Sequence, residues 1–189
     1  MRRVYFEVEN AWKNEDLKEM FLSCVSPFFI DFEASSLSPA SWPIEVGLAW
    51  LDGKRVVAES YLIRPRIEWP EDDWDPESEA VHSITRSDLD NAESADEVTA
   101  WLLKTVAGQT LVSDAPEFDQ RWLDRLLGET GPKIHDFDSV VWDAFSDEGN
   151  VRSGRLHRVY DVRTKRQTTH RAGADAADLC YAWRAGVGK

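Results

Sequence analysis

Cysteine is scarce in this chain of 189 residues, which contains only Cys24 and Cys180. The two residues lie far apart and form neither a CxxC pair nor a Cys/His spacing, so neither a disulfide framework nor a zinc site is indicated. Two thiols that fill the core are the simpler interpretation. They suit a reducing compartment, and we expect a cytoplasmic protein.

Long hydrophobic runs are also missing. No apolar run approaches the roughly 18 residues that a membrane span needs, and residues 1–16 contain no apolar core of a secretion signal. We therefore expect no membrane partner. Hydrophobic residues make up 42% of the chain and nine are tryptophans, which favours a folded protein over a disordered one. Length favours one compact domain, over residues 27–189, with an N-terminal extension, residues 1–26, packed on it.

Basic residues are outnumbered, with 22 Lys and Arg against 35 Asp and Glu and a net charge of −13. This sum argues against a polyanionic ligand, but the charges are unevenly distributed. Between Glu68 and Glu97 lie twelve acidic residues and a single base, whereas Arg152 to Arg171 holds seven Lys and Arg against one acid. The basic segment is either a solvated helix face or, if it lies beside a catalytic site, a set of phosphate contacts.

The hydrophobic pattern predicts an α/β fold with a mixed five-stranded sheet flanked by helices. Three strands open the domain, and an Asp52-Gly53 turn joins the second to the third. The expected strands are 27–33, 44–51, 55–63, 109–112 and 133–137. The expected helices are 76–82, 94–106, 116–128, 140–145, 155–166 and 172–183. In the extension we expect a strand at 4–8 and a helix at 15–24.

The stretch PFFIDFEAS, residues 27–35, places two acids in what otherwise resembles a buried strand. Side chains alternate between the two faces of a strand, so Asp31 and Glu33 share one face while Ile30 and Phe32 share the other. Like charges at this spacing raise each other's pKa or require a counter-charge. A bound cation would supply that charge.

Two further acids stand near predicted helix starts. Asp119 precedes Trp122 and Leu123 by three and four residues and therefore faces the core with them. Asp175 follows His170 by five residues, at the start of the last helix. Each acid taken alone has a simpler explanation, since a carboxylate in the first turn complements the helix dipole.

Taken together, the segments DFEASSL, SDAPEFD and HRAGAD resemble the three motifs of the DEDDh family of 3′-to-5′ exonucleases, in the family's order. The segment AVHSIT, residues 80–85, resembles the family's VHGIT segment. The resemblance extends from Pro27 to the C-terminus. It implies a ribonuclease H-like fold and hydrolysis of phosphodiester bonds at the 3′ ends of RNA or DNA, preferably single-stranded, with release of nucleoside 5′-monophosphates.

The resemblance also implies a role for each residue of these motifs. Two Mg²⁺ or Mn²⁺ ions would be held by acids, and His170 would act as general base. Glu33 would in addition contact the terminal 3′-hydroxyl. A pocket for the terminal nucleotide would follow the first acids, and Arg171 is the favoured phosphate contact. The implied metal ligands are Asp31, Glu33, Asp119 and Asp175, and the implied substrate-binding residues are Ala34, Ser35, Leu37 and Arg171. Relatives of this family are often dimers, so a homodimer is also expected.

The chain departs from the family pattern in two places. Ser35-Ser36-Leu37 stands where the family has Thr-Gly, so the nucleotide pocket differs in shape. Asp114 stands where the family has Asn. Asp114 is an N-cap, a residue that contacts the metal ligands, or an additional metal ligand. Pro116 in the following turn favours the N-cap.

Several alternatives stay open at this stage. The basic residues between 155 and 166 bind phosphates or form a solvated helix face. The tryptophans at 42, 69 and 74 stack on bases or fill the core. The choice between RNA and DNA depends on a pocket that reads the 2′-hydroxyl. Two other functions also fit the acids: an end-binding module that does not cleave, and a metal-dependent hydrolase of small phosphorylated molecules.

Overall fold

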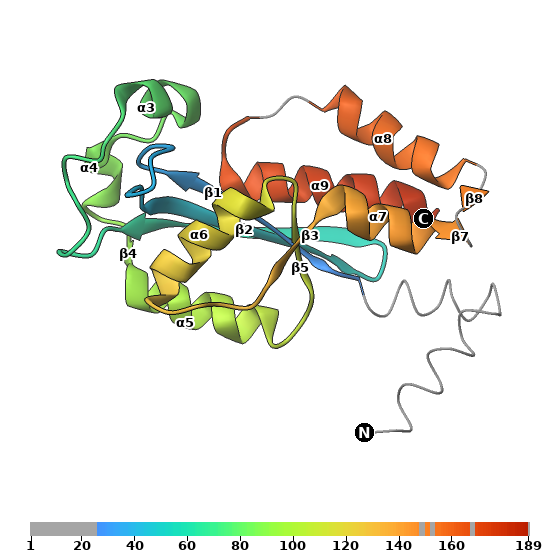
Figure 1. Cartoon of the computed structure of the whole chain (residues 1–189), viewed down its shortest axis with the longest axis horizontal. Helices are drawn as coiled ribbons and strands as arrows, with labels where there is room; N and C mark the ends of the chain where they lie inside the picture. Colours follow the sequence, from blue (N-terminus) through green and yellow to red (C-terminus); the bar gives the residue numbers. More distant parts are fainter. Residues whose placement is uncertain (1–25, 148–149, 152–153, 167–168, 189) are drawn as a thin grey trace.

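A computed structural model describes residues 26–147, 150–151, 154–166 and 169–188 (Figure 1). The strand and helix expected within residues 1–25 lie outside the described residues. The main sheet has the order β4-β3-β2-β1-β5-β6. Strands β1, β2 and β3 pair antiparallel, whereas β1–β5, β5–β6 and β3–β4 pair parallel. The strand bounds are β1 Phe28–Ala34, β2 Pro43–Asp52, β3 Arg55–Arg64, β4 Glu93–Ser94, β5 Leu111–Ser113 and β6 Ile134–Asp136.

Helices cover both faces of this sheet. Figure 1 shows α7, α8 and α9 on one side and α5 and α6 on the other. The long helices are α5 Ala95–Val106, α6 Pro116–Leu127, α7 Phe137–Phe145, α8 Arg155–Lys165 and α9 Ala172–Val187. Two short helices, α3 Pro76–His82 and α4 Arg86–Leu89, lie beyond one end of the sheet. A two-stranded hairpin, β7 Ser146–Asp147 and β8 Asn150–Val151, joins α7 to α8.

The alternation of side chains along β1 separates two hydrophobic cores. Ile30 and Phe32 belong to the core under α5 and α6, whereas Phe29 packs with the residues of α7, α8 and α9 on the opposite face. Burying apolar side chains on both faces stabilises the sheet by roughly 1.5–3 kcal/mol for each fully buried large residue. The polar residues Asp31 and Glu33 stand on the face of Phe29, beyond the end of that second core.

Helix α9 approaches the sheet closely because small residues line the contact. Gly47 of β2 lies against the first residue of α9, where an added Cβ atom would come within 2.2 Å of the Ala172 carbonyl group. Gly173 in turn lies against Ser60 of β3. This close contact fixes where α9 begins, and therefore where its first turn meets β1.

The predicted architecture is confirmed, with two differences. The sheet has six strands rather than five, because the two-residue strand β4 adds to the edge at β3. The hairpin β7–β8 was also not predicted. Strands this short leave no hydrophobic periodicity in a sequence. Among the described residues, no helix is long and apolar enough to cross a membrane.

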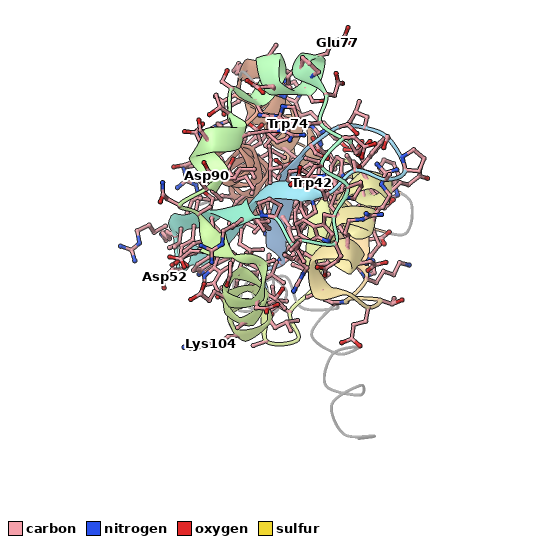
Figure 2. All side chains as sticks on the ribbon, turned by 90° about the vertical axis from the view of Figure 1, so that its left-hand side faces the viewer. Trp42, Asp52, Trp74, Glu77, Asp90 and Lys104 are labelled. Atoms are coloured by element: carbon pink, nitrogen blue, oxygen red, sulfur yellow. The ribbon has the colours of Figure 1, made fainter. Side chains whose placement is uncertain are left out.

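The tryptophans of the loop regions fill the core rather than extend from the surface. Trp42 and Trp69 are buried and stack with ring centroids 5.9 Å apart, and Trp74 packs on Trp42 at 5.7 Å. Figure 2 shows Trp42 and Trp74 within the body of the molecule, while Glu77 and Asp90 lie at its periphery. Of the two interpretations, the structure supports packing.

Candidate active site

The two acids of β1 lie on one face of the sheet, as predicted. Asp31 pairs with Gly47 across the antiparallel ladder, and Glu33 pairs with Glu45. Antiparallel partners share a face, so a glycine stands beside Asp31 and a third carboxylate stands beside Glu33. The absence of a side chain at Gly47 is what allows the start of α9 to reach this part of β1.

Asp119 comes from the first turn of α6 and is 1% exposed. Its carboxylate accepts a hydrogen bond from the Ser113 hydroxyl and another from the backbone of Phe32. The Ser113 hydroxyl is itself fixed by the backbone N–H of Ala115, at 2.9 Å. Asp119 is thus held by the end of β5 and by β1, and does more than complement the helix dipole.

His170 and Asp175 lie on either side of the start of α9. Asp175 Oδ1 accepts hydrogen bonds from the backbone N–H and the hydroxyl of Thr169, at 3.1 and 3.3 Å. His170 adopts a left-handed backbone conformation with φ 52°, and its side chain is exposed. One potential ligand atom from each of Glu33, His170 and Asp175 lies within 4.8 Å of the others.

All five predicted catalytic residues line a single cavity of about 410 Å³. Strand β1 supplies two of them, helix α6 supplies one, and the segment that enters α9 supplies the other two. The cavity is lined by Asp31, Phe32, Glu33, Leu37, Asp114, Ala115, Phe118, Asp119, Trp122, Arg163, Arg166, His170, Asp175, Asp178 and Leu179.

The acids of the cavity strongly perturb one another. Burial raises the pKa of Glu33 to about 8, and the charges of Asp175 and Glu45 add to the effect. Burial raises the pKa of Asp119 to about 7, although the hydrogen bond from Ser113 opposes that change. The pKa of Asp31 is also raised well above its usual value, first by burial and then by the neighbouring acids. Such a cluster favours a cation, which would relieve the repulsion.

Two cations of the basic segment reach this cavity. Arg163 donates to Asp114 at 3.0 Å, and Arg166 contacts Asp178 and lies 3.8 Å from the centroid of the Tyr181 ring. Both arginines line the cavity.

Other basic side chains of α8 have structural contacts instead. Arg158 donates to the carbonyl of Ala185 near the far end of α9, and Lys165 pairs with Asp161 on its own helix. Part of the segment therefore borders the site, and part of it packs on α9 or pairs within its own helix.

The N-cap prediction for Asp114 is wrong. Ala115 occupies the N-cap position of α6, with Pro116 as the first helical residue and no side-chain cap. Asp114 instead pairs with Arg163, 49 residues further along the chain. It therefore joins α8 to the start of α6 at the rim of the cavity.

A second cavity of about 380 Å³ adjoins the first, and both are lined by Glu33, Leu37 and His170. Ala34 also lines the second cavity, and Leu37, at 67% exposed, stands at the mouth of both. Ser35 lines neither cavity. It is fully buried, and its hydroxyl oxygen accepts the N–H of Trp42 at 3.1 Å, so it shapes the loop after β1 rather than the pocket.

His82 is a residue of the second cavity to which the sequence assigned no role. It is 2% exposed, and its Nδ1 accepts the backbone N–H of Ile84 at 3.0 Å. That bond leaves Nε2 as the protonated nitrogen, which is buried on the side of the Ala34 backbone. The resemblance of the AVHSIT segment to the family's VHGIT segment is the sequence signal that could have identified His82.

Arg171 has a different partner from the phosphate that the sequence predicted. Its guanidinium makes two hydrogen bonds of 3.0 Å to the carboxylate of Glu45, and it lines neither cavity. Glu45 is 2% exposed and was not predicted as a site residue. The sequence did contain a signal for Glu45, because it is the one charged residue in the buried run from Pro43 to Ala49.

Four carboxylates and a histidine therefore line one cavity beside strand β1 of a mixed sheet. A family model described as exonuclease, of the RNase T type, matches residues 28–182. The chain therefore belongs to this exonuclease family, as the three motifs predicted. No curated protein matches the sequence closely.

Solved structures of exonucleases share the fold at low sequence identity. E. coli exonuclease I in complex with a dA16 oligonucleotide superposes with a TM-score of 0.59 at 15% identity, over 82% of this chain and 39% of that one. Exonuclease X in complex with 5′ overhanging duplex DNA gives 0.53 at 18%, over 85% and 89%. Cell-death related nuclease 4 gives 0.58 at 12%, over 83% and 62%. The chain thus spans well under half of exonuclease I.

Proposed function

We propose that the chain is a metal-dependent 3′-to-5′ exonuclease that removes nucleoside 5′-monophosphates from the 3′ ends of single-stranded nucleic acid. The single observation that carries this proposal is the convergence of Asp31, Glu33, Asp119, His170 and Asp175 on one open cavity. Three separate segments of the chain contribute to it. Membership in the exonuclease family supports the same reaction.

The acids suit a pair of hard divalent cations. Asp31, Glu33, Asp119 and Asp175 offer only carboxylate oxygens, which Mg²⁺ and Mn²⁺ prefer. Burial, with the charges of neighbouring acids, raises the pKa of the first three, and a bound cation would offset that effect. These four residues would hold the two ions. When bound, the ions would supply Lewis acidity and stabilise negative charge on the reacting phosphate.

The other residues of the cavity have roles other than holding the ions. His170 takes the proton of the attacking water while the new P–O bond forms and the bond between phosphorus and the leaving 3′-oxygen breaks. Its exposed side chain beside Glu33 and Asp175 supports this role. Arg166 and Arg163 lie at the rim, where the next phosphates of the strand would pass.

The second cavity supplies a place for the terminal nucleoside. Ala34 and Leu37 offer apolar contact, and His82 lines the same cavity. Glu33 lies between the two cavities and would accept the terminal 3′-hydroxyl. Arg171 lines neither cavity, and we therefore propose no substrate contact for it.

The experiment that tests this function is a product analysis. A single-stranded oligonucleotide is incubated with Mg²⁺ or Mn²⁺, and the products are separated by chromatography. We expect nucleoside 5′-monophosphates from the wild type and at least about a thousandfold less from Asp31→Ala, since removal of a residue central to such a site commonly costs this much.

Asp52→Asn, an exposed acid on the β2–β3 hairpin, is the matched control and keeps full activity. Nucleoside 3′-monophosphates, or equal activity of wild type and Asp31→Ala, would refute the proposal.

A further inference from the structure

The pair of Glu45 and Arg171 is the most completely bonded ion pair near the site, yet neither residue lines the catalytic cavity. Oε2 of Glu45 accepts Nε of Arg171 and the backbone N–H of Ala172, each at 3.0 Å. Oε1 accepts Nη2 of Arg171 at 3.0 Å and the hydroxyl of Ser60 at 3.3 Å. One buried carboxylate thus binds the side chain before α9 and the first amide of α9.

These bonds fix the backbone beside the catalytic histidine. Arg171 directly follows His170, and its carbonyl accepts the N–H groups of Ala174 and Asp175, at 2.9 and 3.0 Å. On the other side of His170, Thr169 donates to Asp175. His170 is therefore held between two anchors, and this suits its left-handed backbone, which a residue other than glycine adopts only when its surroundings enforce it.

The two anchors are not equivalent. The Thr169 anchor uses Oδ1 of Asp175, one of the four acids proposed to hold cations. The Glu45 anchor uses no atom of the four acids proposed to hold cations. It connects the start of α9 directly to β2, next to the strand that carries Asp31 and Glu33. Of the two anchors, only this second one is independent of the proposed metal ligands.

We infer that Glu45 and Arg171 are positioning residues, which fix His170 and Asp175 relative to the acids of β1. This inference rests on the proposed function, in which those residues are catalytic. It differs from a phosphate contact by Arg171, because a positioning residue acts on the chemical step and a phosphate contact acts on substrate binding.

The test compares Arg171→Met, Glu45→Gln, Arg171→Lys and the double variant Glu45→Gln/Arg171→Met. We expect Arg171→Met and Glu45→Gln to lower kcat by about 10- to 100-fold with KM changed less than about twofold, since small displacements of catalytic groups cost this much. The double variant should lose about as much as either single one, because one interaction is removed. Arg171→Lys keeps the charge but loses the bidentate hydrogen bonding to the carboxylate, and should recover part of the kcat that Arg171→Met loses.

A substrate contact predicts a different pattern. Arg171→Met would then raise KM with little change in kcat, and Glu45→Gln, which frees the guanidinium, would leave KM unchanged or lower it. That result would overturn the inference. Arg55→Met removes an exposed ion pair to Asp52 on the hairpin and serves as the matched control with wild-type kinetics.

A readout independent of activity separates this inference from the proposed function. Hydrogen exchange of the segment 169–176 should be faster by about tenfold or more in Arg171→Met than in the wild type, and Mn²⁺ binding, followed by electron paramagnetic resonance, should weaken.

If the wild type proves inactive but these two changes appear, the positioning role stands and the proposed function fails. Unchanged exchange and unchanged Mn²⁺ binding in Arg171→Met would contradict the positioning role itself, whatever the activity.

Discussion

At the scale of single residues, the site is defined by carboxylates that a metal-free protein tolerates poorly. Burial and neighbouring charges raise the pKa of Glu33 to about 8 and that of Asp119 to about 7. An acid whose pKa is higher in the folded state than in the unfolded one binds its proton more tightly when folded. Its contribution to stability is therefore complete at low pH and is lost as pH rises toward the folded-state pKa.

The metal-free protein should accordingly lose stability as pH rises from about 4.5, the usual value for Glu33, to about 8. Glu33→Gln removes the part of this effect that comes from Glu33, while Asp31 and Asp119 keep theirs. In EDTA we expect its melting temperature to exceed that of the wild type by a few degrees at about pH 8 and to match it at about pH 5, since about 1 kcal/mol corresponds to roughly 2–4 °C in a chain of this size.

Thermal unfolding followed by circular dichroism measures this difference. Glu129→Gln, which neutralises an exposed loop acid, is the control without a pH-dependent change. A wild-type melting temperature that rises steadily between these two pH values would show that the acids of the site are not destabilising.

At the scale of elements, the site depends on where α6 and α9 begin. Each helix presents an acid from its first turn, Asp119 and Asp175, toward the end of β1. The start of α9 is set by its contact with Gly47, where a Cβ atom would meet the Ala172 carbonyl at 2.2 Å. Backbone atoms cannot move aside as the tip of a side chain can, so the helix itself would have to shift.

Gly47→Ala should therefore displace the start of α9. We expect a loss of about 1–3 kcal/mol of stability, typical of overpacking, together with a fall in kcat of about tenfold or more. Urea unfolding and steady-state kinetics measure the two effects. Ala58→Ser, an exposed position on the adjacent strand β3, should change neither. Wild-type kcat in a folded Gly47→Ala protein would show that the position of α9 does not control the site.

The strands and helices also show which parts of the structure could be predicted from the sequence and which could not. The carboxylates of β1 were found because strand alternation is a local rule, and the long amphipathic helices followed from their periodicity. The same local rule applies to Glu45, the single acid in its buried run. Its partner Arg171 lies 126 residues away, and that of Asp114 lies 49 residues away. Contacts across such separations depend on the fold as a whole, so the sequence did not predict the partner of Arg171 and misassigned Asp114 as an N-cap.

At the scale of the whole molecule, a net charge of −13 is combined with a cavity whose rim carries Arg163 and Arg166. The negative field of the protein opposes long-range attraction of nucleic acid. It favours divalent cations at the same site. Metal binding should therefore couple to the stability of the entire domain, because a ligand that binds only the folded state stabilises it in proportion to its occupancy.

Saturating Mn²⁺ should raise the melting temperature by several degrees, since a ligand at about one hundred times its Kd contributes roughly 2.7 kcal/mol. The shift should increase as pH rises from about 6 to about 8, because protons compete with the metal for Glu33 and Asp119. Differential scanning calorimetry with and without the ion measures it. Asp31→Ala should abolish most of the shift, and an equal shift in that variant would locate the metal elsewhere.

The direction of attack on a labelled strand tests the proposed 3′-to-5′ exonuclease activity most directly. Single-stranded RNA and DNA of the same sequence carry a 5′ label and are followed over time with Mg²⁺ or Mn²⁺, with EDTA, and with Asp31→Ala. We predict a ladder that shortens from the 3′ end only with metal and only with the intact site. Shortening from the 5′ end, cleavage inside the strand, or strands that stay intact under every metal condition would contradict it.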